Sequence, residues 1–166
     1  MKDERAATRP PGDGSLADTL TLEHMECIGK ARLLIIDDDE MTCRVIHDAL
    51  AHPDFDIRTV NQVAHIEETI RRQESLHLVI LDFVLPGVQT EVVLAWIHQL
   101  HPAAEVIVIT GYPTVEGAQT ALRARVFDYI TKPFQLAHLR RTVIKCLEAR
   151  GVLRMTVEAL RLAVGA

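Results

Sequence analysis

The amino-acid sequence predicts an α/β protein with a doubly wound, five-stranded parallel sheet. Short apolar or alternating runs recur roughly 21 to 28 residues apart, at Leu33–Ile36, Phe55–Val60, Leu78–Leu81, Val106–Ile109 and Phe127–Ile130. Segments long enough for helices separate them, at about Glu40–Ala51, Gln62–Gln73, Thr90–Leu100 and Val115–Arg125. This strand–helix repeat is typical of a parallel sheet, and right-handed crossovers place its helices on both faces.

The individual elements follow from their residue types. The first, third and fourth runs are continuous and rich in Ile, Val and Leu, as expected of strands buried on both faces. The second and fifth runs alternate apolar and polar residues, which also indicates strands. Aspartates that follow a strand are common helix caps, so Asp38 and Asp39 fit the start of the first helix, and Thr90 fits the start of the third.

Composition and charge limit the function classes. The chain has 166 residues, of which 48% are hydrophobic, and a net charge of −5. One compact domain fits this length, and the charge leaves no broad basic surface for nucleic acid or anionic lipid. The three cysteines are odd in number, far apart and without metal-ligand spacing, which predicts reduced thiols in a cytoplasmic protein. We expect no signal peptide and no membrane span.

The ends of the chain are predicted to differ from its middle. Residues 1–29 contain a Pro/Gly cluster and are expected to form a flexible extension, whereas residues 30–150 form the domain. Residues 151–166 are expected to prolong the last helix, giving one long helix over residues 135–164. The alternative is that the last helix ends near Arg150 and that a separate short helix folds back on the domain. Apolar residues spaced alternately four and three apart predict a coiled-coil homodimer along it: Leu139, Val143, Cys146, Leu153, Val157, Leu160 and Val164, with Arg150 as the one break.

Polar side chains gather where the predicted strands end. Asp37, Asp38 and Asp39 follow the first strand, and Asp82 follows the third. Thr110-Gly111 and Lys132-Pro133 follow the fourth and fifth. In an open α/β sheet, ligands bind at these carboxyl ends. Converging carboxylates are what Mg²⁺ recruits, and a lysine and a hydroxyl nearby suit phosphoryl oxygens. The sequence therefore favours phosphoryl transfer, which needs mainly positioning and charge neutralisation.

These motifs resemble the receiver domains of two-component response regulators, which have a flavodoxin-like (βα)5 fold. The resemblance covers about residues 32–150, through Asp37-Asp38-Asp39, Asp82-Phe-Val-Leu-Pro86-Gly87, Val-Ile-Thr110-Gly111 and Tyr129-Ile-Thr-Lys132-Pro133-Phe134. It is strongest to receivers that precede enhancer-type ATPase modules. No phosphate-binding loop or helix-turn-helix is recognisable in the sequence.

The resemblance implies a role for each matched residue. Asp82 is the expected phosphoacceptor, charged by a histidine kinase or phosphotransfer protein. Mg²⁺ is the expected cofactor, held by Asp38, by Asp37 through water, by Asp82 and by the Val84 backbone carbonyl. Further expected roles are phosphoryl contact for Thr110 and Lys132, space for that group at Gly111, an aromatic switch at Tyr129, and tuning of dephosphorylation by Val84 and Tyr112.

Such a domain assists its own phosphorylation and dephosphorylation and is not otherwise an enzyme. Two alternatives remain. A haloacid-dehalogenase-type phosphatase would use Asp37 and Asp39, although Asp82 then has no role and no later acidic pair follows Lys132. A receiver-like module that binds partners without phosphorylation would be expected to lack one of the key residues.

The histidines suggest no further site. His98 and His101 are three residues apart near the end of a predicted helix, but no third ligand flanks them, so both are expected at the surface. His52, His65 and His77 are interpreted in the same way.

Overall fold

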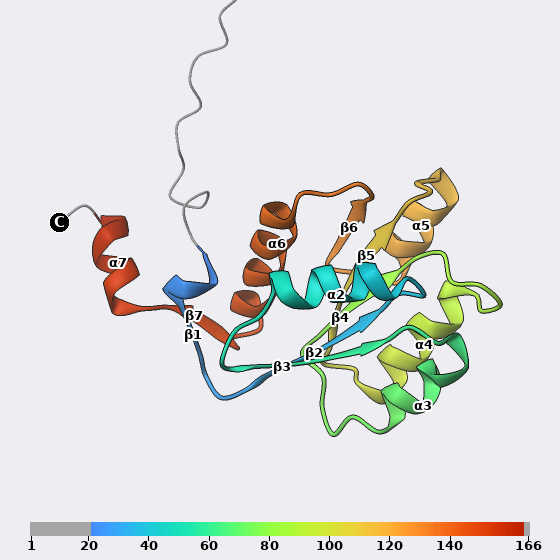
Figure 1. Cartoon of the computed structure of the whole chain (residues 1–166), viewed down its shortest axis with the longest axis horizontal. Coiled ribbons are helices and arrows are strands. Elements are labelled where there is room, and N and C mark those ends of the chain that lie inside the picture. Colours follow the sequence, from blue (N-terminus) through green and yellow to red (C-terminus); the bar gives the residue numbers. More distant parts are fainter. Residues whose placement is uncertain (1–20, 165–166) are drawn as a thin grey trace, which may run out of the picture.

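The computed structural model describes residues 21–164 and confirms the predicted sheet (Figure 1). Its strands are β2 (Ala31–Ile36), β3 (Phe55–Val60), β4 (Leu78–Asp82), β5 (Glu105–Thr110) and β6 (Asp128–Thr131). They are parallel and lie in the order β3-β2-β4-β5-β6. The order reverses at β2, so the carboxyl ends of β2 and β4 border the crevice in which this type of sheet binds ligands. No helix among the described residues is long and apolar enough to cross a membrane.

Alternate residues of each strand build two separate cores, because successive side chains point to opposite faces of a sheet. Leu33 and Ile35 of β2 belong to one buried cluster, and Leu34 and Ile36 belong to the other. Helices α2 (Glu40–Ala49) and α6 (Leu136–Ala149) cover the first cluster. Helices α3 (Ile66–Arg71) and α4 (Thr90–Leu100) cover the second. Helix α5 (Val115–Arg123) joins β5 to β6.

Helix bounds agree with the sequence except near helix ends. Helix α4 has the predicted range, whereas α2 stops two residues early and α5 ends at Arg123. The second predicted helix begins as a 3-10 turn, η2 (Val63–His65), and becomes α-helical only over Ile66–Arg71. A single turn of this kind is common at a helix terminus.

The prediction of one long C-terminal helix is wrong. Helix α6 ends at Ala149, β7 (Leu153–Met155) follows, and a separate helix α7 spans Val157–Val164. Gly151, at φ +67°, ends α6: its amide donates to the Glu148 carbonyl at 2.8 Å, and the Val152 amide donates to the Leu147 carbonyl at 2.8 Å. This pair of bonds is the Schellman motif, which favours glycine at the left-handed position.

The predicted coiled-coil seam is therefore divided among three elements. Leu139, Val143 and Cys146 are fully buried against the sheet, and Leu153 is buried in β7. No continuous helical stripe runs from residue 139 to residue 164, so the homodimer expected along it loses its structural basis.

Part of the predicted N-terminal extension is folded. Of residues 1–29, residues 1–20 lie outside the described part of the chain. A 3-10 turn, η1 (Leu22–His24), leads into β1 (Met25–Cys27), which pairs antiparallel with β7. Leu22 and Met25 are buried in the same core cluster as α2 and α6. Figure 1 shows this two-stranded sheet beside α6, with α7 beyond it. The domain thus includes segments on both sides of the predicted boundaries.

Three histidines expected at the surface are buried or half-buried, namely His52, His77 and His101. His101 is only 8% exposed, and its Nε2 lies 2.8 Å from the Ile70 carbonyl oxygen, where it forms a hydrogen bond between the α4 and α3 segments. His77 is half-buried, and its Nδ1 accepts a hydrogen bond from the Arg32 amide at 2.9 Å. The positions of His77 and His101 depend on packing between segments that are distant in the sequence. The spacing of residues along one helix cannot predict such packing.

Candidate functional site

Three carboxylates meet at the carboxyl edge of the sheet. Asp37 follows β2 directly and is 2% exposed, and Asp82 is the last residue of β4 and is 7% exposed. Asp38 is exposed at the rim. One oxygen of each carboxylate lies within 4.8 Å of the other two. The parallel pairing of β2 with β4 places these residues together, because both strands end at the same edge.

Lys132 supplies the positive charge at this edge. Its Nζ lies 2.8 Å from Asp37 Oδ2 and 2.7 Å from Asp82 Oδ2, so it forms salt bridges with both buried acids. The backbone amide of Lys132 donates to the Thr110 carbonyl at 2.7 Å, which continues the pairing of β5 and β6 beyond the strands. One lysine therefore lies between two carboxylates whose like charges would otherwise repel each other.

Burial and pairing act against each other in this cluster. Burial raises the pKa of the Asp37 carboxyl above its usual value, and the Asp82 charge raises it further, although the hydrogen bond from Lys132 opposes the change. For Lys132, burial lowers the pKa, but hydrogen bonds to Asp37 and Asp82 outweigh it and raise the pKa overall. Additional positive charge at the site would stabilise the ionised acids.

Backbone amides orient the two buried acids. The Asp39 amide donates to Asp37 Oδ1 at 2.9 Å, and the Val84 amide donates to Asp82 Oδ1 at 2.9 Å. In each acid, one carboxylate oxygen therefore accepts a hydrogen bond from the loop that follows the strand, and the other oxygen contacts Lys132. A bond of this type, from the amide two residues ahead, is typical of aspartates that end a strand.

Asp39 has a structural role that does not favour the phosphatase pairing. Its Oδ1 accepts from the Met41 amide at 3.0 Å, and its Oδ2 accepts from the Thr42 hydroxyl at 2.7 Å. The Thr42 hydrogen bond holds the pKa of the Asp39 carboxyl below its usual value. The side chain therefore caps α2, whereas the three-acid cluster consists of Asp37, Asp38 and Asp82. An Asp37/Asp39 catalytic pair does not fit this arrangement.

The predicted residues of the neighbouring loops divide between the core and the mouth of the site. Thr110 is fully buried, and its hydroxyl oxygen accepts from the Tyr112 amide at 3.1 Å. Gly111, Val84 and Tyr112 line a cleft of about 370 Å³ together with the acids and Lys132. Val84 is 47% exposed and Tyr112 is 73% exposed, so both lie at the mouth of the cleft.

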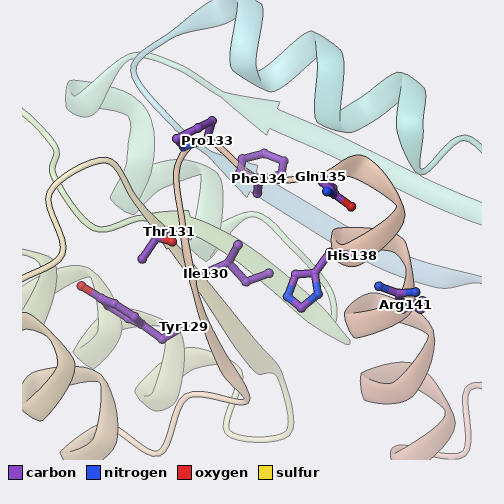
Figure 2. Close-up of a pocket in the computed structure, with 8 residues that line it drawn as sticks. All are labelled: Tyr129, Ile130, Thr131, Pro133, Phe134, Gln135, His138 and Arg141. Carbon is purple, nitrogen blue, oxygen red and sulfur yellow. The ribbon is translucent and has the colours of Figure 1, made fainter. Parts of the chain in front are cut away.

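Tyr129 lies outside the acid cluster, on β6. Its ring meets that of Phe83 edge to face, with centroids 6.1 Å apart. Figure 2 shows its hydroxyl pointing away from His138 and Arg141 of α6, toward the interior. This hydroxyl is buried and has no hydrogen-bond partner within residues 21–164. A buried unpaired hydroxyl costs free energy, so Tyr129 is held in this position by packing.

Gly117 leaves the space that the Tyr129 side chain occupies, and the sequence did not predict this role. A Cβ at Gly117 would lie 3.2 Å from the Tyr129 hydroxyl and 3.1 Å from Phe83 Cε1. The predicted cap of α4 by Thr90 is wrong. Gln89 occupies the cap position, and the Thr90 hydroxyl donates to the Phe83 carbonyl. Neither contact leaves a local sequence signal.

The donor set at the carboxyl edge fits a hard divalent cation. Two nearly buried carboxylates and a third at the rim provide oxygen ligands within reach of one ion. Magnesium prefers such ligands and keeps several waters. The buried acids already recruit a cation in the form of Lys132. The same cleft leaves Asp82 accessible from the side of Val84 and Tyr112.

Comparison with known proteins gives one family. A model of the response regulator receiver domain matches residues 33–144. The response regulator protein PilR of Pseudomonas aeruginosa is 31% identical over 124 residues, which are 75% of this chain and 28% of PilR. The transcriptional regulatory protein ZraR of Escherichia coli is 30% identical over 115 residues, covering 69% of this chain and 26% of ZraR. The chain thus spans about a quarter of the length of these curated relatives.

Solved structures agree on the fold. A CheY-like response regulator receiver domain protein from Methanospirillum hungatei superimposes with a TM-score of 0.69 at 24% identity, covering 74% of this chain and 98% of that one.

Proposed function

Because this chain belongs to the family of response regulator receiver domains, we propose that Asp82 is its phosphoacceptor. The chain is a receiver domain of two-component signal transduction, and such a domain is generally not a classical enzyme. Its relatives are enhancer-binding-type regulators, as the sequence predicted. The observation that carries the proposal is the position of Asp82, which is buried beside Asp37 and Lys132 yet lines the open cleft.

The proposed reaction moves a phosphoryl group from a phosphohistidine to Asp82. A carboxylate oxygen of Asp82 attacks phosphorus, the phosphorus–nitrogen bond breaks, and an aspartyl phosphate forms. Asp82 Oδ1 is held by the Val84 amide, whereas Oδ2 contacts Lys132. The attacking atom is therefore Oδ2, because it faces the charge that an incoming phosphoryl group requires.

The metal ligands in this proposal are Asp37, Asp38, Asp82 and the Val84 carbonyl. Mg²⁺, when bound, neutralises the charge that accumulates on the phosphoryl oxygens. The residues themselves orient the acceptor and bring two acids to one edge. Lys132 then exchanges its contact with Asp82 for one with the acquired phosphoryl group, while keeping its contact with Asp37.

Coupling to the rest of the protein is assigned to Thr110 and Tyr129. Thr110 lies at the end of β5 next to Gly111, and its hydroxyl oxygen accepts a hydrogen bond from the Tyr112 amide. Contact with a phosphoryl group would turn this hydroxyl toward Asp82 and shift the loop that follows. Tyr129 is suited to respond, because its buried hydroxyl has no hydrogen bond to another described residue that a movement would break.

The partner implied by the receiver family is a histidine kinase or a phosphotransfer protein. A cytoplasmic location, Mg²⁺ dependence and assistance by the chain in its own dephosphorylation belong to the proposal. The net charge of −5 supports the absence of direct nucleic-acid binding by this segment.

The test is phosphorylation by a small phosphodonor. Acetyl phosphate with Mg²⁺ should add one phosphoryl group, seen as a single mass increase in intact-protein mass spectrometry. Asp82→Asn should abolish it, because an amide is a poor nucleophile. Asp48→Asn, an exposed substitution on α2, is the matched control and should be labelled normally. Unchanged labelling of the Asp82→Asn protein contradicts the proposal.

A further inference from the structure

A second group of metal-ligating side chains lies at the opposite edge of the sheet. It consists of Cys27, His52 and Asp54, and one ligand atom of each lies within 4.8 Å of the other two. Cys27 belongs to β1, whereas His52 and Asp54 flank Pro53 in the loop before β3. All three are half-buried. Their separation in sequence explains why residue spacing gave no sign of a site.

Hydrogen bonds hold the backbone of these residues in place. The Asp54 carbonyl accepts from the Ala31 amide at 3.0 Å, which ties the loop to the start of β2. The His52 carbonyl accepts from the Phe55 amide at 3.0 Å, and the His52 ring packs against the Phe55 ring with centroids 5.0 Å apart. Cys27 lies opposite Leu153 in the β1–β7 pair. Backbone hydrogen bonds and strand pairing therefore hold the three residues whose side chains converge.

The chemistry of this set differs from that of the Asp82 site. A thiolate, an imidazole and a carboxylate are ligands of zinc, and three protein ligands leave a fourth position open to water. Magnesium disfavours sulfur and nitrogen ligands. The Asp54 amide donates to His52 Nδ1 at 3.1 Å, which holds the imidazole ring beside Asp54.

We propose that Cys27, His52 and Asp54 bind a divalent transition-metal ion of the zinc type, separate from the Mg²⁺ site. On binding, the Cys27 S–H bond breaks, a sulfur–metal bond forms and the proton passes to solvent, with no change of oxidation state. The ion joins β1 to the loop before β3 and so fastens the N-terminal segment to the receiver core. This proposal does not depend on phosphorylation of Asp82.

The experiment uses Co²⁺ as the probe on the full, reduced chain after removal of bound metal. Co²⁺ should produce a near-ultraviolet thiolate-to-cobalt charge-transfer band with one ion per chain, and Zn²⁺ should displace it. Mg²⁺ in excess should leave the band unchanged. Asp82→Asn should also retain the band, which distinguishes this site from the acid cluster.

Variants identify the ligands. Cys27→Ser should abolish the band although Cys43 and Cys146 remain. His52→Gln and Asp54→Asn should each weaken Co²⁺ binding at least about tenfold, a loss seen even for residues that only support a metal ligand. His47→Gln and Asp48→Asn are matched controls, because these side chains form an exposed pair on α2, with Nδ1 and Oδ1 3.2 Å apart. Circular dichroism checks that each variant is folded.

A second measurement needs no variant. Zn²⁺ should slow alkylation of Cys27 by iodoacetamide in the wild-type chain, followed by peptide mass spectrometry, whereas Mg²⁺ should not. The proposal is overturned if Co²⁺ gives no charge-transfer band, if the band persists in Cys27→Ser, or if Zn²⁺ leaves Cys27 alkylation unchanged.

Discussion

The two edges of the central sheet use contacts of different kinds. At the carboxyl edge, Lys132 bridges Asp37 and Asp82, so charged groups are held out of water. At the amino edge, the Arg32 amide donates to His77, and the apolar side chains of β1 and β7 close the core. Charged groups held out of water can take part in a reaction, but they contribute little to the net free energy of folding. Burial of apolar side chains stabilises the fold and supplies no reactive group. Variants at the two edges should therefore separate phosphorylation from folding.

The largest expected effect lies at the amino edge. Leu153→Ala removes a side chain that is 3% exposed from the core shared by β7, α2 and α6. Truncating a buried leucine in this way costs about 2–4 kcal/mol of the free energy of unfolding. Urea unfolding should show this loss while acetyl phosphate labelling of the folded protein keeps its rate. Leu160→Ala, at a position that is 46% exposed, is the control and should change stability little.

A smaller loss is expected at the carboxyl edge, and it should depend on the metal. Lys132→Met leaves Asp37 and Asp82 without their shared cation. Breaking a fully buried pair costs about 3–5 kcal/mol, but the Lys132 side chain is 26% exposed. A loss of about 1–3 kcal/mol without Mg²⁺ is therefore expected. Mg²⁺ should restore part of it, because an ion that binds only the folded state stabilises that state. An equal loss with and without Mg²⁺ would contradict the metal assignment.

The third prediction concerns the mouth of the carboxyl-edge cleft. Val84 and Tyr112 are exposed there, and neither activates water well at neutral pH, because valine forms no hydrogen bond and a tyrosine hydroxyl is a poor general base. The phosphorylated protein should decay over many minutes. The Val84→Asn, Tyr112→Glu double variant should decay faster, and a tenfold change corresponds to about 1.4 kcal/mol in the barrier. Loss of phosphate after removal of the donor measures this, and a double variant that decays no faster than wild type rules out gating.

The smallest effect is a pH dependence at the amino edge. Burial, Arg32 and Arg150 lower the pKa of His77 in the folded state. The unfolded chain therefore takes up this proton first, so stability should be unaffected above pH ~6.5 and should fall as pH drops below it. His77→Asn keeps an acceptor for the Arg32 amide and does not titrate. Urea unfolding at pH 7.5 and 5.5 should show a loss in wild type of less than about 1.4 kcal/mol per pH unit beyond that of the variant. An equal loss in both proteins would exclude His77 as the cause.

The sequence predicted the carboxyl edge well because its residues are fixed by strand ends. Asp37, Asp82 and Lys132 each follow a recognisable apolar run, and parallel strands bring their carboxyl ends together. The cap of α2 by Asp39 was also predicted, because an aspartate after a strand commonly caps a helix. The role of Gly117 was not, since it depends on contacts with Phe83 and Tyr129, which are distant in the sequence.

The terminal segments could not be predicted in the same way. The spacing from residue 139 to residue 164 is compatible with one helix, but Gly151 in a left-handed conformation ends α6. Pairing of Glu26 with Arg154 then favours a strand, through a contact between residues 128 positions apart. Local patterns carry no information about such a partner, and tertiary contacts override helix propensity.

The most direct test of the central claim is chemical identification of the phosphorylated residue. Borohydride reduces an aspartyl phosphate to homoserine, which peptide mass spectrometry locates in the chain. After treatment with acetyl phosphate and Mg²⁺, homoserine should appear at position 82, and it should be absent when Mg²⁺ is removed by chelation. Homoserine at position 37, 38 or 39, or none at any position in a protein that carries phosphate, would contradict the assignment of Asp82.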